Sequence, residues 1–321
     1  MSHNESKQIN IVFASDDNYA QHAAVAAASI LLNAEHPEKM YFFILEDGIS
    51  EKKQRKIQQT IESLKGHIVF IPVKGEDFSS FFVSAQLSRA AYFRLAVAHL
   101  LPQNVGRAIY LDCDLLVFAD IEDLWYTDMG GAVIAAVPDC GIMASSRSRK
   151  EKKACIGLPY DMEYFNSGVI LMDIDAWRNE NCGEKLAALV KENDYPHHDQ
   201  DALNELFLGR WCRLPLKWNV IPPVWFMFMK VVFSPWRKEA ATARQHPAIL
   251  HYAGGYKPWE YDIYEGFNDE YYKVLEKTAF SDAKMPQFDK RKKHRSIGRQ
   301  MVRLKIGGFW GSLFGKQEKN L

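Results

Sequence analysis

Features that are scarce or absent in this sequence narrow the class of protein before any motif is considered. Only five cysteines occur among 321 residues, at positions 113, 140, 155, 182 and 212, and none of them form a Cys-x-x-Cys pair. Their number is odd, which argues against a disulfide framework, and their spacing argues against a zinc site made of thiolates. Such sparse use of cysteine is typical of a protein in a reducing compartment.

The chain also lacks the hydrophobic segments that direct proteins into membranes. The N-terminal stretch MSHNESKQIN is polar and has no apolar core like that of a signal peptide. No run of about 18 apolar residues is present, so we expect no membrane-spanning segment. Charge is balanced, with 40 basic and 40 acidic residues, which gives no indication of nucleic-acid binding. We therefore expect a cytoplasmic protein that does not bind nucleic acid.

No internal repeat or low-complexity linker divides the chain, and apolar runs alternate with helical patterns. We predict strands at residues 9–14, 40–45, 67–73, 107–114, 131–139 and 166–174. We predict helices at residues 19–34, 50–64, 88–101, 183–193 and 199–208. This alternation is typical of a mostly parallel sheet with helices on both faces. The sequence thus predicts a single α/β domain from about residue 8 to residue 280.

Glycine is missing from the turn after the first predicted strand, where a dinucleotide-binding fold carries G-x-G-x-x-G. The turn reads ASDDN instead, and Asp16 and Asn18 offer a carboxylate and an amide. These groups either contact the hydroxyls and amides of a nucleoside or cap the following helix. Ligands bind at the carboxyl ends of strands in such sheets. Asp139 ends a later predicted strand, so it belongs to the same expected edge.

Two aspartates, Asp112 and Asp114, interrupt the apolar run RAIYLDCDLLVF. Neighbouring carboxylates raise each other's pKa unless a cation lies between them. Mg²⁺ and Mn²⁺ are suitable cations, and both commonly bridge to substrate phosphates. If the strand continues regularly, both side chains lie on one face; the alternative is a polar turn. The apolar strand before the pair favours a metal site, and we expect Cys113 to face inward and pack.

His251 and Lys257 lie in a second polar stretch, AILHYAGGYKPW, with Gly254 between them. Glycine allows a ligand to approach the backbone closely, and the lysine offers a positive charge to a phosphate. An imidazole added to carboxylates shifts the preferred metal from Mg²⁺ toward Mn²⁺. A histidine at the end of a strand also has a purely structural interpretation.

The stretch HHDQDALNELF forms a third polar cluster. We expect Asp199 to be the N-cap of a helix and Asp201 to favour its first turn through the helix dipole. Gln200 is needed for neither purpose, which makes it a candidate for a functional role.

These stretches, taken in order, resemble those of family 8 glycosyltransferases, in particular bacterial lipopolysaccharide or lipooligosaccharide α-galactosyl- and α-glucosyltransferases. The matching segments are IVFASDDNYA, SRAAYFRL, AIYLDCDLLV, FNSGVILMDIDAWR, HHDQDALN and LHYAGGYKPW, from residue 10 to about residue 260. The resemblance implies a GT-A fold, which is a single Rossmann-like domain. It also implies a UDP-galactose or UDP-glucose donor and Mn²⁺, with Mg²⁺ as the alternative metal.

The resemblance also assigns roles to individual residues. It implies that the metal is held by Asp112, Asp114 and His251. It implies that the donor is bound by Ala14, Asp16 and Asn18 at the uridine, by Arg94, Asn166 and Asp199 around the sugar, and by Gly254 and Lys257 at the diphosphate. The catalytic residues it implies are Gln200, Asp199 and Asp139.

Family members retain the anomeric configuration, and Gln200 corresponds to the position below the anomeric carbon. A retaining glycosidase uses a carboxylate nucleophile at this place, and a neutral amide is a poor substitute. We therefore expect a front-face reaction, in which the donor phosphate assists the acceptor hydroxyl.

Two segments bear on the acceptor. The aromatic stretch 219–236 forms either a lid and an acceptor wall or a core or dimer contact. Residues 281–321 carry eleven Lys and Arg against three Asp and Glu, a net charge of +8. A basic segment with an apolar aromatic stripe is typical of a chain that lies on an anionic membrane, although a disordered tail is the alternative. We expect peripheral association with the inner face of the cytoplasmic membrane and a saccharide or lipid-linked glycan acceptor.

Three other functions fit parts of the sequence. A haloacid-type phosphatase would use Asp112 as nucleophile, but that class has Thr or Val two residues after its D-x-D pair, whereas Leu115 and Leu116 follow here. A catalytically silent UDP-sugar-binding protein would be free to lose its metal ligands, and all are present. A self-glucosylating enzyme like glycogenin needs a surface tyrosine, which the 14 tyrosines allow.

Overall fold

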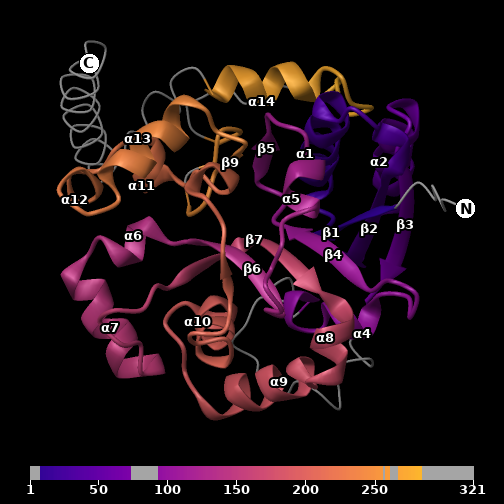
Figure 1. The fold of residues 1–321 in the computed structure, drawn as a ribbon. Coiled ribbons are helices and arrows are strands. Elements are labelled where there is room, and N and C mark those ends of the chain that lie inside the picture. Colours follow the sequence, from indigo (N-terminus) through magenta and orange to yellow (C-terminus); the bar gives the residue numbers. More distant parts are fainter. Residues whose placement is uncertain (1–7, 74–92, 256, 261–266, 284–321) are drawn as a thin grey trace, which may run out of the picture.

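A computed structural model describes residues 8–73, 93–255, 257–260 and 267–283 (Figure 1). The strands are β1 Ile9–Asp16, β2 Met40–Asp47, β3 His67–Pro72, β4 Arg107–Leu111, β5 Leu115–Val117, β6 Ile134–Pro138, β7 Phe165–Asp173, β8 Cys212–Arg213 and β9 Ile249–His251. The longer helices are α1 Ala20–Asn33, α2 Glu51–Ser63, α7 Ser146–Ile156, α8 Ile174–Asn179, α9 Cys182–Glu192, α10 His198–Leu206, α13 Arg237–Gln245 and α14 Phe267–Leu275. The single-turn helices are α4 Val97–Leu100, α5 Glu122–Trp125, α6 Cys140–Met143, α11 Pro222–Trp225 and α12 Met229–Val232.

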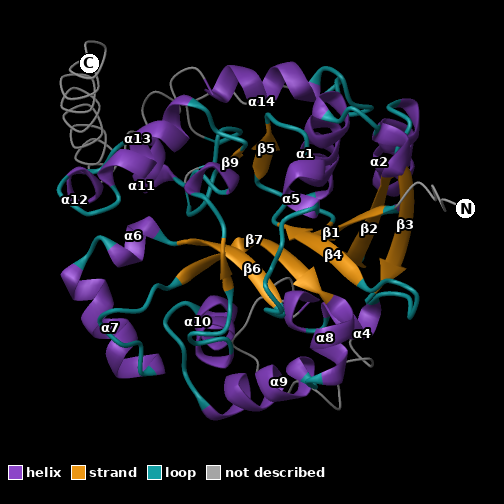
Figure 2. Cartoon of the chain, in the orientation of Figure 1, coloured by secondary structure: helices purple, strands orange, loops and turns teal. Residues whose placement is uncertain are grey.

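Seven strands form the central sheet in the order β3-β2-β1-β4-β7-β6-β8 (Figure 2). Neighbouring strands are parallel except where β7 pairs with β4 and β6, both of which it meets antiparallel. The predicted α/β class and mostly parallel sheet are confirmed. The reversed direction of β7 was not predicted, because an apolar run reads the same in either direction.

Helices cover both faces of the sheet, and each face has its own apolar core. Alternate residues of a strand point to opposite faces, so Ile11 and Phe13 of β1 pack into one core and Val12 into the other. The first core includes α1 and α13, and the second includes α9 and α10. In Figure 1, α1, α2 and α14 lie on one side of the sheet, and α8, α9 and α10 lie on the other.

The predicted strand at 107–114 is wrong at its C-terminal end. β4 stops at Leu111, the chain bends through the two aspartates, and Leu115–Val117 forms the separate strand β5. β5 pairs antiparallel with β9, with Leu115 opposite His251. The continuous strand was predicted from the apolar residues on both sides of the bend, and the sequence alone does not reveal that they belong to different sheets.

The structure also bears on the predictions for Cys113, for the helix at 88–101 and for the aromatic segment 219–236. Cys113 is 6% exposed and packs in the first core, as expected. The predicted helix at 88–101 is described only from residue 93, and α4 covers its last turn. Within the 219–236 segment, Val220, Val224 and Val231 are buried in the core, whereas Phe233 is 76% exposed.

The basic tail falls almost wholly outside the described residues, which end at position 283. Among the residues that the structure does describe, no helix has the length and apolar character needed to cross a membrane.

Candidate active site

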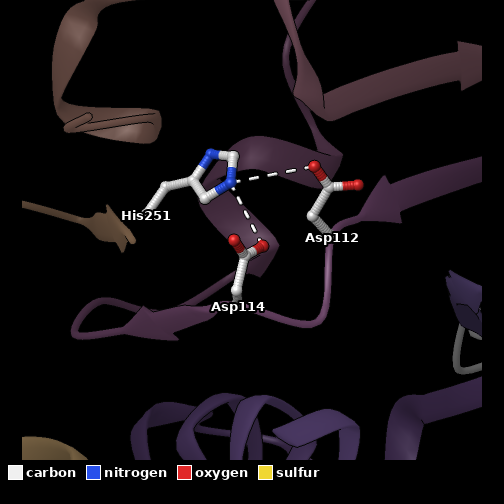
Figure 3. A group of neighbouring side chains, drawn as sticks. All are labelled: Asp112, Asp114 and His251. Carbon is white, nitrogen blue, oxygen red and sulfur yellow. Dashed lines mark ion pairs between the residues drawn. The ribbon is translucent and has the colours of Figure 1, made fainter. Parts of the chain in front are cut away.

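Three predicted metal ligands converge just beyond the carboxyl end of β4 (Figure 3). Asp112 and Asp114 come from the bend between β4 and β5, and His251 is the last residue of β9. The His251 Nε2 atom lies 3.7 Å from Asp112 Oδ2 and 3.2 Å from Asp114 Oδ1. One ligand atom of each residue lies within 4.8 Å of the others. The pairing of β5 with β9, rather than strand continuity, brings the histidine to the carboxylates.

Asn219 and Gly168 shape this cluster from behind. Asn219 Oδ1 lies 3.0 Å from His251 Nδ1, and its amide nitrogen donates to Asn166 Oδ1 at 2.8 Å. A proton on Nδ1 leaves the Nε2 lone pair facing the carboxylates, which is the usual arrangement of a metal-binding histidine. A Cβ atom at Gly168 would lie 2.3 Å from His251 Cε1 and 2.8 Å from Asp112 Oδ2. Only glycine leaves room for both ligands here.

The donor set and its surroundings therefore fit a divalent cation. Carboxylate oxygens and an imidazole nitrogen are donors that divalent cations accept. Burial alone would raise the pKa of Asp114, but His251 and Lys257 hold it below its usual value, so the carboxylate is ionised. The Lys257 ammonium pairs with Asp114 and donates to Tyr252 O at 2.9 Å. A cation that binds here would thus meet the ionised carboxylate of Asp114, which lies beside the ammonium group of Lys257.

Arg94 joins the cluster of Asp112, Asp114 and His251 to α10. Its buried guanidinium pairs with Asp112 and with Asp199, and it donates to Ser167 Oγ at 2.7 Å. The guanidinium carbon lies 4.7 Å from the centre of the Tyr110 ring. Burial raises the pKa of Asp199, and Arg94 opposes that shift. The predicted N-cap role of Asp199 is wrong: the N-cap is His197, and Asp199 lies within α10 with its carboxylate on Arg94.

Gln200 is held by hydrogen bonds on both ends of its amide. Its Oε1 atom accepts from Ser167 N at 3.1 Å and from Asn166 Nδ2 at 3.2 Å. Its Nε2 atom donates to Asp139 Oδ2 at 3.3 Å. Asp139 also caps α6 by accepting from Ile142 N at 3.0 Å. The predicted residues Gln200, Asp139 and Asn166 therefore form one connected group.

The polar residues predicted at the end of β1 mainly contact their neighbours in the chain. Asp16 accepts a hydrogen bond from Tyr19 N at 2.9 Å and from Asn18 Nδ2 at 3.3 Å. The Ala14 carbonyl accepts from Cys113 Sγ at 3.2 Å, which ties β1 to the bend after β4. Asp16 thus holds the turn before α1 with both carboxylate oxygens and is half-buried, whereas Asn18 is exposed. Gly254 has a φ of +91°, a value that strongly favours glycine.

Several residues at the site were missed from the sequence. Gly168 lies in the quoted FNSG stretch, where only its neighbour Asn166 was considered. Asn219 is a lone amide in an apolar segment and gives no periodic or motif signal. Tyr19 is 37% exposed, and burial together with the charge of Asp114 raises its pKa to about 12. Gly168 and Asn219 become visible only in the fold, which brings both of them against His251.

The fold and the site together define a class of protein. A mostly parallel sheet flanked by helices, with a D-x-D cluster beyond a strand end and a lysine beside it, is the arrangement of a GT-A glycosyltransferase. The chain belongs to glycosyl transferase family 8, whose family model matches residues 10–263. The resemblance seen in the sequence is confirmed, and the protein is a family 8 glycosyltransferase.

Bacterial relatives are similar over most of the chain. General stress protein A of Bacillus subtilis is 29% identical over 280 residues, 85% of this chain and 95% of that protein. The lipopolysaccharide 1,2-glucosyltransferase of Escherichia coli is 29% identical over 316 residues, 95% of this chain and 90% of that enzyme. The lipopolysaccharide 1,3-galactosyltransferase of Salmonella typhimurium is 27% identical over 262 residues, 80% of this chain and 74% of that enzyme.

Among solved structures, the galactosyltransferase LgtC in complex with donor and acceptor sugar analogues matches with a TM-score of 0.72 and 28% identity. The match covers 87% of this chain and 98% of that chain. A second LgtC structure, with the same score and identity, is that of an active-site mutant in which a glutamine is replaced by glutamate. The predicted GT-A fold is thereby confirmed.

Proposed function

We propose that this enzyme is a retaining, metal-dependent hexosyltransferase. It would move galactose or glucose from a UDP-sugar to a saccharide acceptor, with lipopolysaccharide or another cell-surface glycan as the class of acceptor. The observation that carries the proposal is the cluster of Asp112, Asp114 and His251, with Lys257 on one side and Arg94 on the other. Similarity to the lipopolysaccharide glucosyl- and galactosyltransferases supports the choice of sugar and acceptor.

The charges around the cluster suit the diphosphate of such a donor. A divalent cation, preferably Mn²⁺ and otherwise Mg²⁺, would be held by Asp112, Asp114 and His251 and would stabilise the charge on the departing UDP. Lys257 neutralises Asp114 in the structure and can turn its ammonium to a diphosphate oxygen. The left-handed backbone at Gly254 allows the same segment to approach the phosphates closely.

The far side of the cluster would bind the sugar. Arg94 and Asp199 form an ion pair there, and these charged groups suit sugar hydroxyls. Arg94 also donates to Ser167 Oγ, and Ser167 and Asn166 both donate to Gln200 Oε1. Asp16 and Asn18, with the Ala14 backbone, would contact the uridine. Asp139 would act by holding the Gln200 amide in place.

The bonds made by Gln200 support a front-face reaction. Its carbonyl oxygen already accepts from Ser167 and Asn166, so its lone pairs are engaged and it is a poor nucleophile. In the proposed reaction, the bond from the anomeric carbon to the phosphate oxygen breaks. The acceptor oxygen then bonds to that carbon on the same face, and its proton passes to the phosphate. The Gln200 oxygen would stabilise the positive charge that develops on the sugar.

We further propose that residues 8–280 form the transferase domain and that residues 281–321 attach it to an anionic membrane. The net charge of +8 in the tail supports this assignment. The enzyme would then work in the cytoplasm, at the inner face of the cytoplasmic membrane, where a lipid-linked acceptor is within reach.

Release of UDP from a panel of UDP-sugars tests the proposed reaction. We expect slow release from UDP-galactose or UDP-glucose with Mn²⁺ and no acceptor, and its loss with EDTA. Intact-mass measurement in the same samples should show no hexose added to the protein, which excludes self-glucosylation. If no donor is cleaved, and Asp112→Asn binds UDP as the wild type does, the chain is a silent UDP-sugar-binding protein.

A further inference from the structure

Lys152 is buried in the middle of a helix on which three other basic residues, Arg147, Lys150 and Lys153, are exposed. Its side chain is 0% exposed, whereas Lys150 and Lys153 on the same helix, α7, are exposed. An ammonium group inside a protein is costly unless it is paired and hydrogen-bonded. Lys152 meets this condition with Asp201 of α10, whose two carboxylate oxygens lie 2.7 and 2.8 Å from Nζ.

Asp201 is also fully buried, and its carboxylate gathers three kinds of donor. Beside Lys152, it accepts from the Tyr164 hydroxyl at 2.7 Å and from the His197 backbone N–H at 2.8 Å. Burial and the charge of Asp201 raise the pKa of Tyr164 above its usual value, so the phenol remains a donor. The Lys152 ammonium also contacts His197 Nδ1 at 2.6 Å. This buried group therefore joins α7, the start of α10 and the residue before β7.

The first turn of α10 needs such support. Its N-cap, His197, provides no side-chain cap, and the next residue, His198, has a left-handed φ of +45°. A non-glycine residue in that region is strained and persists only when its surroundings fix it. The bond from the His197 N–H to Asp201 supplies one constraint, and the Lys152 ion pair fixes Asp201 in turn.

Two residues that follow Gln200 anchor this helix. Asp201, the next residue, is bound to Tyr164. Asn204, one turn further along, accepts from Phe165 N at 2.8 Å and donates to Phe165 O at 2.9 Å. The Gln200 amide in turn reaches Ser167 on the same strand at 3.1 Å. The position of Gln200 relative to β7 therefore depends on whether both anchors hold.

We propose that Lys152 is a positioning residue for the transfer reaction. Its ion pair with Asp201 holds the first turn of α10 so that Gln200 faces the anomeric carbon of the donor. The inference depends on the proposed role of Gln200. Lys152 itself touches none of the residues assigned to the metal, the uridine or the diphosphate, so its effect passes through α10.

A double-mutant cycle between Lys152→Met and Gln200→Ala tests this pathway. The readout is UDP release from UDP-galactose and UDP-glucose with saturating Mn²⁺. We expect Lys152→Met to lower kcat at least about tenfold, because small misplacements of reacting groups cost that much or more. The KM for the donor should change less than about twofold, since the diphosphate contacts are intact. In the Gln200→Ala background, Lys152→Met should cost almost nothing further.

The controls separate positioning from folding. Lys153→Met removes an exposed lysine next in sequence and should leave kcat, KM and the thermal midpoint unchanged. If Lys152→Met fails to fold, Tyr164→Phe replaces it, because it removes one donor to Asp201 and leaves the ion pair in place. We expect Tyr164→Phe to give a smaller loss of kcat with the same non-additivity toward Gln200→Ala.

Each contrary outcome has a distinct meaning. If the losses from Lys152→Met and Gln200→Ala multiply, or if folded Lys152→Met has normal kcat, the positioning role is overturned and the proposed function stands. If Gln200→Ala alone keeps wild-type turnover, the proposed role of Gln200 is lost, and the positioning role with it.

Discussion

At the scale of single residues, Gly168 is the most restrictive position of the site. Its missing Cβ leaves the space that His251 Cε1 and Asp112 Oδ2 occupy. We predict that Gly168→Ala displaces both ligands and raises the Mn²⁺ concentration for half-maximal UDP release at least about tenfold. A Mn²⁺ titration of UDP release measures this.

Gly183→Ala is the matched control for that substitution. Gly183 lies in α9, and a Cβ there would meet Leu95 O at an ordinary 3.7 Å. Alanine in a helix is favoured over glycine by about 0.5–1 kcal/mol, so this variant should be as stable as the wild type or more so, with the same Mn²⁺ titration. An unchanged titration for Gly168→Ala would show that the three ligands do not bind the metal together.

Asn219 gives a second prediction at this scale. Its oxygen orients His251, and its nitrogen reaches Asn166, so it couples the metal cluster to the group around Gln200. Removing a partner that orients a metal-binding histidine costs about 10–100-fold in metal affinity. We therefore expect Asn219→Leu to weaken Mn²⁺ binding by that factor, measured by titration calorimetry. Binding of Mn²⁺ at wild-type strength would contradict this role.

At the scale of elements, an aromatic group joins α1, α14 and the segment after Lys257. His22 of α1 stacks on Trp259 with ring centres 3.5 Å apart, and its Nδ1 lies 2.5 Å from the Tyr271 hydroxyl. Burial is the main cause that lowers the pKa of His22 from 6.5 to about 3. The folded protein thus keeps this imidazole neutral where the unfolded chain would protonate it.

This shift sets the sign of a pH dependence. Between pH 6.5 and pH 3 the unfolded state binds more protons at His22, so the free energy of unfolding falls as pH falls through this window. From pH 6.5 to pH 5 the contribution is about 1–2 kcal/mol. We expect urea denaturation of the wild type to show this loss, and His22→Phe to lose less over the same range. Parallel pH curves for the two proteins would contradict the buried neutral histidine.

How much of each element the sequence predicts depends on whether its signal is local. The bounds of β1, β2, β3 and α2 were predicted to within two residues. Their signals are local, because the spacing of apolar residues within one short segment indicates a strand or a helix. The break between β4 and β5 was not predicted, since it is caused by pairing with β9, which lies more than a hundred residues away. The reversal of β7 has the same non-local origin.

The same distinction applies to the site. Asp112, Asp114 and His251 were predicted as a set through the family resemblance, and the structure brings them together. Asp199 was misassigned as a cap because Asp before a helix fits that role locally, whereas Arg94 lies 105 positions away. The sequence gives no sign that Lys152 is buried, because it lies in a run of basic residues of the kind that is usually exposed to solvent.

At the scale of the whole molecule, the transferase body and the basic tail should be separable. Deleting residues 284–321 removes eleven Lys and Arg. The described body has its cores and its site without these residues. We predict that the truncated protein keeps Mn²⁺-dependent UDP release and loses sedimentation with vesicles that contain phosphatidylserine.

Vesicles of phosphatidylcholine alone are the control, and neither protein should bind them strongly. Salt should weaken binding of the full chain to anionic vesicles, because attraction between Lys or Arg and a charged surface is screened. Equal sedimentation of the full and truncated proteins with anionic vesicles would show that the tail is not the attachment segment.

The central claim is that Asp112, Asp114 and His251 hold a divalent cation on which the donor diphosphate binds. Titration calorimetry of UDP, with Mn²⁺ and then with EDTA, tests it most directly, in the wild type and in Asp114→Asn. We predict UDP binding in Mn²⁺ that weakens at least about tenfold in EDTA, and a similar weakness of Asp114→Asn under both conditions. Equally tight binding by the wild type with and without Mn²⁺ would contradict the claim.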